Sequence, residues 1–436
     1  MPPRHQRDAS GEGVGGGHDA NCAMDTDTCP NRARFALILS KTPDCASGKL
    51  VDMTSGRPFG VYIHVPFCAT RCGYCDFNTY TPAELGGANP DGWLVALRTE
   101  LGLAAARLGT PPAVQTVFVG GGTPSLLGGA GLEAVLGAVR EHFRLADGAE
   151  VSTEANPEST SPELFDRLRA AGYTRVSLGM QSAAPHVLAV LDRVHSPGRA
   201  PAAAREARAA GFDHVNIDLI YGTPGEFDDD LRRSIDTALE AGVDHVSGYA
   251  LVVEEGTALA RRVRRGEIEA PQDDVLARRY ELLDGRLAQA GFGWYEVSNW
   301  SRPGGQCRHN LGYWDGGEWW GAGPGAHSFL GSTRWWNVKH PNAYAQSLAN
   351  GVLPVDDSEE LDGDALHTED VMLRLRLRSG LPLAVLNAAE RERAQVAVDD
   401  GLAGRRGDRL VLTDRGRLLA DAVVRDLLMV SEVAGA

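Results

Sequence analysis

From residue 59 onward, short runs of β-branched and aromatic residues alternate with longer stretches that space their apolar residues as a helix does. The apolar runs are GVYIHVP (60–66), TVFVGGG (116–122), EVSTEANP (150–157), RVSLGMQS (175–182), HVNIDLIYG (214–222) and HVSGYALVV (245–253). Between them, stretches such as 161–173 predict helices, here with Ser161 as the N-cap and Glu163 in the first turn. This alternation, repeated six times, predicts an α/β fold with a parallel sheet, closed or partly closed as a barrel.

The predicted strands end in polar residues or glycine rather than in further apolar residues. These strand ends hold Cys68, Gly120 to Thr123, Glu154, Asn156, Gln181 and Asp218. A strand with a purely structural role in a buried parallel sheet stays apolar to its end. In barrels of this type the chemistry lies at the carboxyl ends of the strands. The pattern therefore predicts one ligand site built from several strand ends.

Three segments break the alternation, so we expect the barrel over residues 59–290. Residues 291–362 are crowded with Trp, Gly and His. Residues 363–436 predict helix, turn and helix followed by a β-hairpin, the order of a small winged-helix-like domain. Residues 1–58 show neither a helix nor a strand period, so we expect a disordered tail. Met53 is a second candidate start, which would make that tail a mis-annotation.

The composition narrows the class of protein. A net charge of -15 over 436 residues argues against nucleic-acid binding as the main activity. No apolar run is long enough to span a membrane and no secretory signal is visible, so we expect a cytoplasmic protein. In that compartment clustered cysteines bind metals more often than they form disulfides. Cys22, Cys29 and Cys45 in the tail lack the paired spacing of metal ligands, so we do not expect them to bind one.

The stretch YIHVPFCATRCGYCDFNTY (62–80) holds Cys68, Cys72 and Cys75 in a C-x3-C-x2-C spacing. Cys72 and Cys75 alone would suit a thioredoxin-like redox pair, and a structural zinc site would need a fourth ligand such as His64. Three thiolates leave one iron of a [4Fe–4S] cluster open, because a closed cluster takes four. An open iron can bind the amino and carboxylate groups of S-adenosylmethionine, which the protein positions. We therefore expect an open cluster.

Other strand-end residues suit the same ligand. Gly120–Gly122 let the backbone approach a ligand closely, although a glycine triplet also marks a plain tight turn. Glu154 and Asp218 suit ribose hydroxyls and ammonium groups, and Arg193 suits a carboxylate through its planar fork. Each alone is equally well read as a polar residue satisfied by its neighbours. Together with Gln181, on successive strands, they favour a ligand site.

The stretch CRHNLGYW (307–314) places His309 beside large aromatic residues. A histidine in a flat apolar cleft suits an axial haem ligand. The alternative is an aromatic cap that seals the barrel, with His309 hydrogen-bonded to it, and the residues alone favour this cap. Cys307 and His327 are further conceivable ligands.

Several long motifs, in this order along the chain, resemble one family. YIHVPFCATRCGYCDF, GGGTPS, STEANPES, SLGMQS, NIDLIYGTPGE and CRHNLGYW…GAGPGAHS resemble the HemW-type haem chaperones, which are oxygen-independent coproporphyrinogen III oxidase-like proteins of the radical S-adenosylmethionine (radical SAM) superfamily. The resemblance covers about residues 59–436 and implies a partial (β/α)6 TIM-like radical SAM barrel. It implies a [4Fe–4S] cluster, S-adenosylmethionine and haem, an electron donor to the cluster, and haem-dependent membrane or respiratory proteins as acceptors. It leaves a homodimer open.

The resemblance also implies roles for individual residues. Its cluster ligands fall on Cys68, Cys72 and Cys75. Its S-adenosylmethionine contacts fall on Tyr62, Tyr74, Gly121, Gly122, Thr123, Glu154, Gln181, Arg193 and Asp218. The family's H-N-x-x-Y-W haem motif falls on His309, which reverses the preference for an aromatic cap.

Two other functions stay open beside the chaperone. A true coproporphyrinogen III oxidase carries a further cysteine right after the cluster in a C-x-C arrangement, whereas Asp76 and Phe77 follow Cys75 here. The third reading is a haem carrier whose cluster is only structural. The intact set of predicted cluster and S-adenosylmethionine ligands argues against it. We therefore expect a chaperone without oxidase activity and name no catalytic residue.

Overall fold

The computed structural model describes residues 56–193 and 196–429, and six parallel strands stand side by side there in chain order. They are β1 (Phe59–Val65), β2 (Val114–Gly121), β3 (Leu145–Ala155), β4 (Arg175–Gln181), β5 (His214–Tyr221) and β6 (His245–Ala250). The predicted parallel sheet is confirmed, and each predicted run overlaps one of these strands. Residues 1–55 of the predicted tail, with Cys22, Cys29 and Cys45, lie outside the described residues.

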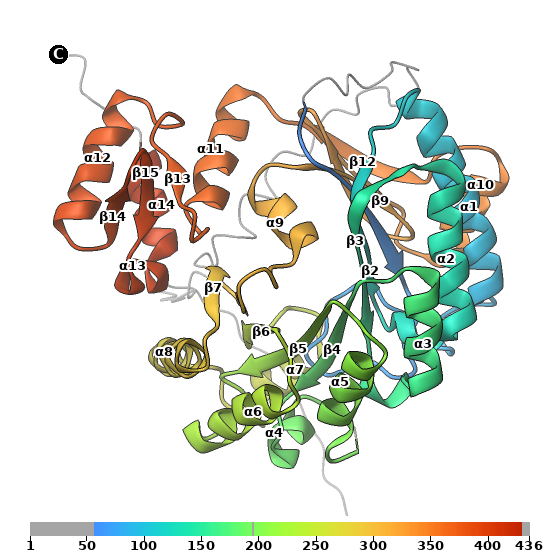
Figure 1. Cartoon of the computed structure of the whole chain (residues 1–436), viewed down its shortest axis with the longest axis horizontal. Helices are drawn as coiled ribbons and strands as arrows, with labels where there is room; N and C mark the ends of the chain where they lie inside the picture. The colour runs from blue at the N-terminus through green and yellow to red at the C-terminus, as the bar shows by residue number, and fades with distance from the viewer. Residues whose placement is uncertain (1–55, 194–195, 430–436) are drawn as a thin grey trace, which may run out of the picture. The chain divides into compact units, whose positions relative to one another are not determined.

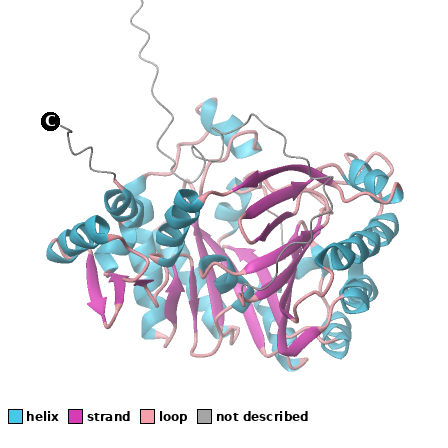
Figure 2. Ribbon diagram, turned by 90° about the horizontal axis from the view of Figure 1, so that it is seen from above, coloured by secondary structure: helices cyan, strands magenta, loops and turns pink. Residues whose placement is uncertain are grey.

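Helices follow each of the six strands, and most of them pack on the outer side of the sheet (Figure 2). They are α1 (Pro90–Leu108), α2 (Gly128–His142), α3 (Pro162–Ala171), α4 (Pro185–Val190), α5 (Arg199–Ala209), α6 (Asp228–Glu240), α7 (Ala258–Arg264) and α8 (Asp273–Gln289), with 3-10 turns at Pro124–Leu127 and Pro157–Ser159. Helix α3 begins as predicted, because the Ser161 side chain accepts a hydrogen bond from the Leu164 N–H. None of the described helices combines the length and apolar character that crossing a membrane requires.

The Trp-, Gly- and His-rich segment extends the sheet at both edges. Strand β9 (Glu318–Ala322) pairs in parallel with β1, and β8 (Asn299–Ser301) pairs antiparallel with β6. Further strands and a helix in this segment are β7 (Gly293–Glu296), β10 (His327–Leu330), β11 (Thr333–Asn337), β12 (Val355–Glu360) and α10 (Pro341–Ala349). The short helix α9 (Arg308–Trp314) contacts β1 and β2 and lies on the inner side of the curved sheet (Figure 1).

The C-terminal segment has an apolar core of its own, which includes Val371, Leu375 and Leu410. Its elements are α11 (Gly363–Arg374), β13 (Leu381–Pro382), α12 (Ala388–Asp399), β14 (Ala403–Arg406), β15 (Arg409–Leu412), α13 (Asp414–Leu418) and α14 (Ala420–Leu428). Two helices therefore precede a β-hairpin, in the order that the sequence predicts. The likeness to a winged helix stays a prediction.

Candidate functional site

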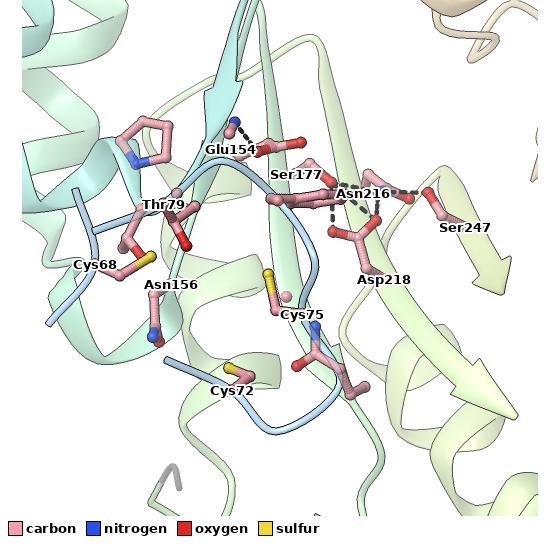
Figure 3. A pocket seen from close by; sticks show the side chains of 18 of the residues that line it. Cys68, Cys72, Cys75, Thr79, Glu154, Asn156, Ser177, Asn216, Asp218 and Ser247 are labelled. Atoms are coloured by element: carbon pink, nitrogen blue, oxygen red, sulfur yellow. Dashed lines mark hydrogen bonds between the residues drawn. The ribbon is translucent and has the colours of Figure 1, made fainter. Parts of the chain in front are cut away.

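A cavity of about 520 Å³ opens at the carboxyl ends of the barrel strands. All of the site residues predicted from the sequence line it: Tyr62, Cys68, Cys72, Tyr74, Cys75, Gly121, Gly122, Thr123, Glu154, Gln181, Arg193, Asp218 and His309. The volume lies within the range of cavities that bind cofactors and small molecules. Figure 3 shows the three cysteines on one loop, across from Glu154 and from the polar network around Asp218.

Alternate residues of the barrel strands are polar or glycine, and these residues line the cavity. On β4 it is lined by Arg175, Ser177, Gly179 and Gln181. Val176 and Leu178, between these residues, point to the opposite face and are buried in the apolar core. Barrel interiors of this class are usually filled by branched apolar side chains. The polar residues here line an open space instead.

The cysteine loop is tied to two neighbouring elements. The Gly73 N–H donates to the Leu191 carbonyl at 3.0 Å, and the Leu259 N–H donates to the Gly73 carbonyl at 2.8 Å. Two polar side chains reach the sulfur atoms: the Arg193 guanidinium lies 3.4 Å from Cys72 Sγ, and the Thr123 hydroxyl lies 3.7 Å from Cys68 Sγ. Three half-buried thiols are therefore held around one end of the cavity, with a cation beside them.

The thiols favour an iron–sulfur cluster over a single metal ion. In the part of the chain that the structure describes, no three His, Cys, Asp or Glu side chains converge closely enough to hold one ion. His64, the candidate fourth zinc ligand, hydrogen-bonds the Asn78 carbonyl at 2.9 Å and the Tyr62 hydroxyl at 3.1 Å. A cubane cluster spreads its thiolates over different irons, so it needs the three cysteines farther apart than one ion does. The donor set therefore fits a cluster.

Burial favours the protonated form of two of the three loop thiols. It raises the pKa of the Cys75 thiol to about 11 and also raises the pKa of Cys68. A metal binds the thiolate form, so iron would have to displace these protons when a cluster is inserted.

The glycine triplet brings the backbone close to the cysteine loop. Gly121 has a φ of 112°, which favours glycine, and a Cβ atom on Gly122 would come within 2.5 Å of the Phe67 carbonyl oxygen. The Gly121 N–H donates to Glu154 Oε2 at 2.9 Å. The triplet thus fixes the position of a buried carboxyl group as well as that of the backbone.

Two carboxyl groups, Glu154 on β3 and Asp218 on β5, face the cavity from either side of β4 in a low-dielectric setting. Burial raises the pKa of Glu154 to about 8, with a further contribution from the charge of Asp218. Burial also raises the pKa of Asp218, although Ser177 and Asn216 donate to its oxygens at 3.0 and 2.7 Å. Both groups are poised to gain from a positively charged ligand, which would favour their ionised forms.

The raised pKa of Glu154 predicts a pH-dependent stability for the ligand-free protein. In the unfolded chain Glu154 ionises near its ordinary value of 4.5, whereas the folded chain holds the proton up to about pH 8. Folding therefore becomes less favourable as the pH rises from 4.5 to 8. We expect thermal melts to show Glu154→Gln gaining stability relative to wild type over this interval. A difference that does not vary with pH would contradict the assignment.

Two side chains at the rim of the cavity have unused hydrogen-bonding groups. Within the described residues, Gln181 Oε1 and Arg193 Nε are buried and have no hydrogen-bond partner. Gln181 also has a φ of 63°, a backbone conformation that costs free energy for a residue other than glycine. Buried polar atoms normally have partners, so a polar ligand at this rim would complete the site.

His309 also lines the cavity and is 4% exposed. Its Nδ1 atom lies 2.8 Å from the Thr116 hydroxyl and its Nε2 atom 2.7 Å from the Tyr313 hydroxyl. Burial lowers the pKa of His309 to about 4, so the imidazole is neutral at pH 7. His309 is therefore enclosed by aromatic side chains, as the cap reading expects, and it also lines the cavity. Haem ligation by His309 stays a prediction.

The two weaker haem-ligand candidates have different settings. Cys307 is buried, and its Sγ atom lies 3.5 Å from Glu150 Oε1. His327 is exposed and lines a neighbouring cavity of about 590 Å³ with His64 and Lys339.

Sequence reasoning missed a buried ion pair beneath the predicted site. Arg175 Nε donates to Glu150 Oε2 at 3.1 Å, and both side chains are less than 5% exposed. Glu150 Oε1 accepts the His309 N–H at 3.0 Å. The sequence did indicate that Glu150 faces the site. Glu150, Ser152 and Glu154 are every second residue of one strand, so the first two side chains lie on the same face as the predicted site residue Glu154.

Known proteins resemble this chain along most of its length. A model of the Radical SAM superfamily matches residues 62–238. The heme chaperone HemW of Mycobacterium tuberculosis (strain CDC 1551 / Oshkosh) is 74% identical over 373 residues, which span 86% of this chain and 95% of that protein. The heme chaperone HemW of Escherichia coli (strain K12) is 31% identical over 382 residues, which span 84% of this chain and 97% of that protein.

The fold has a counterpart among solved structures. Coproporphyrinogen III oxidase (HemN) from Escherichia coli, a radical SAM enzyme, superimposes with a TM-score of 0.73 over 85% of this chain and 90% of that chain. The sequence identity of that pair is 24%, so the match demonstrates a shared fold.

Proposed function

This chain belongs to the HemW family of haem chaperones, and we propose that it carries haem as its cargo and holds a [4Fe–4S] cluster with S-adenosylmethionine in the barrel cavity. The observation that carries the proposal is that three free thiols and ten further predicted ligand residues line one cavity. These residues come from the cysteine loop, several barrel strands and α9, so only the folded barrel brings them together.

Different side chains of the cavity would bind the cluster and the separate groups of S-adenosylmethionine. Cys68, Cys72 and Cys75 would each bind one iron, and a bound cluster can pass an electron to S-adenosylmethionine. Arg193, beside Cys72, suits the carboxylate of that molecule, and Glu154 and Asp218 suit its cationic and hydroxyl groups. Gly121 and Gly122 leave the backbone open to close approach.

For haem, we propose His309 as an iron ligand. The imidazole is neutral at pH 7, which is the form that binds a metal. Ligation through Nε2 requires the Tyr313 hydroxyl to leave its present position 2.7 Å from that atom. The aromatic rings of Tyr62 and Phe118 lie near His309 and would exclude water from the iron.

We further propose delivery of the haem to haem-dependent membrane or respiratory proteins, with a separate electron donor to the cluster. The family supports this step. Coproporphyrinogen III oxidase activity is the alternative function. The residues after Cys75 weigh against it, because Asp76 and Phe77 stand where the oxidases continue with a further cysteine.

A haem titration of His309→Ala tests the proposed ligand. Losing an iron ligand is expected to weaken haem affinity by at least about tenfold and to change the visible haem spectrum. The matched control is His186→Ala, because His186 is exposed on α4 and pairs there with Asp230 at 3.0 Å. Equal affinities for wild type and both variants would refute His309 as the ligand.

A further inference from the structure

The floor of the barrel cavity lies well away from the rim where S-adenosylmethionine is proposed to bind. Arg175 opens β4 and Gln181 ends it, and both line the cavity. Five residues lie between them, and the six steps of extended strand span about 20 Å. The proposed function gives the Arg175 side chain no ligand.

Arg175 at the floor has one unused donor group. Its Nε atom donates to Glu150, and its Nη2 atom donates to the carbonyls of Gly305 and Gln306 at 2.9 Å. Within the described residues, Nη1 makes no hydrogen bond, although the side chain is 3% exposed. A buried charged donor without a partner is costly, so its presence at a cavity wall indicates a missing acceptor.

The charges around Arg175 favour a ligand with a single negative charge. Glu150 already compensates part of the guanidinium charge, and Asp244 adds a smaller share. Burial lowers the pKa of His245 well below its ordinary value, so this neighbour is neutral. Tyr295 lies 2.8 Å from His245 and offers a neutral hydroxyl at the same floor. A carboxylate suits the one unused guanidinium nitrogen in these neutral surroundings, whereas a phosphate dianion would need a second cation.

Between floor and rim, three nearly parallel rings line the cavity. Phe118 and His309 have ring centroids 5.3 Å apart with planes inclined by 25°. Tyr62 and Phe118 have centroids 6.3 Å apart with planes inclined by 23°. Rings in this arrangement suit the face of a flat, largely apolar molecule.

We propose that Arg175 forms a carboxylate subsite at the floor of the cavity, for an organic acid carried on a flat apolar body. For the haem cargo this acid is a propionate group. The inference rests on the proposed function for the identity of the cargo. The inference adds to that function the residue that binds one propionate. The propionate edge of the macrocycle would then face the barrel floor.

Comparing haem with its dimethyl ester tests the subsite. The ester keeps the iron and the flat body but has no carboxylate, so wild type is expected to bind haem at least about tenfold more tightly than the ester. The double variant Glu150→Gln/Arg175→Gln removes both buried charges together and is expected to bind the two compounds with nearly equal affinity. Affinities are measured by the change in Soret absorbance.

The matched control is Glu226→Gln/Arg279→Gln. Glu226 and Arg279 form another buried ion pair, at 2.8 Å, and neither lines this cavity. This variant is expected to keep the wild-type preference for haem. Equal binding of haem and ester by wild type, or a preserved preference in the Arg175 double variant, would overturn the subsite. Wild type that binds neither compound would instead overturn the proposed function.

Discussion

Replacing Cys72 with serine is expected to abolish the iron–sulfur absorbance at roughly 400 nm after anaerobic reconstitution, together with most of the bound iron. Serine removes one of the three thiolates. The cluster is proposed to have no fourth cysteine ligand, so the two remaining thiolates cannot hold it. Cys72 is also the thiol that Arg193 contacts, at 3.4 Å. Iron analysis and the visible spectrum of the same sample measure the effect.

Cys307→Ser is the control for this experiment. Cys307 is buried and lines the same cavity, but it belongs to the α9 segment and hydrogen-bonds Glu150 rather than lying on the cysteine loop. Its loss is expected to leave iron content and absorbance at wild-type levels. Full iron loading of Cys72→Ser would contradict the three-thiolate assignment.

Replacing Arg175 with alanine is expected to cost about 3–5 kcal/mol of unfolding free energy. Burial alone would raise the pKa of Glu150, but the charge of Arg175 and the His309 N–H lower it, so the carboxylate is ionised and buried. Alanine would leave that charge without its cation. It would also remove the two hydrogen bonds to Gly305 and Gln306 that hold the chain leading into α9.

Urea denaturation at pH 7 measures this loss, with Glu150→Gln/Arg175→Gln beside it. Removing both partners of a buried pair costs much less than removing one, so the double variant is expected to recover most of the stability. If Arg175→Ala is at least as stable as Glu150→Gln/Arg175→Gln, Glu150 does not carry a buried charge.

The barrel and its cysteine loop were predictable because each is indicated by residues close together in the sequence. Six apolar runs, each ending in polar residues or glycine, give the parallel strands and place Glu154, Gln181 and Asp218 at one edge of the sheet. The C-x3-C-x2-C spacing likewise identifies the cysteine loop from its own residues. The structure brings all of these groups to one cavity, as the topology of parallel strands requires.

The floor of the cavity was not predictable in the same way. Helix α9 interacts with strands more than 150 positions earlier in the chain, through Thr116 and Glu150. No local pattern in the CRHNLGYW stretch indicates these partners. The Glu150–Arg175 pair was only partly predictable: alternation along the strand puts Glu150 on the same face as Glu154, but charged residues usually face solvent and nothing local links Glu150 to Arg175. Only the fold shows that both side chains point inward.

We propose above that this radical SAM chain carries haem rather than making its precursor. One anaerobically reconstituted sample, divided between a haem titration and a coproporphyrinogen III decarboxylation assay with S-adenosylmethionine and a reductant, tests it most directly. We expect saturable haem binding and no decarboxylated product. Stoichiometric conversion to protoporphyrinogen, without saturable haem binding, would contradict it.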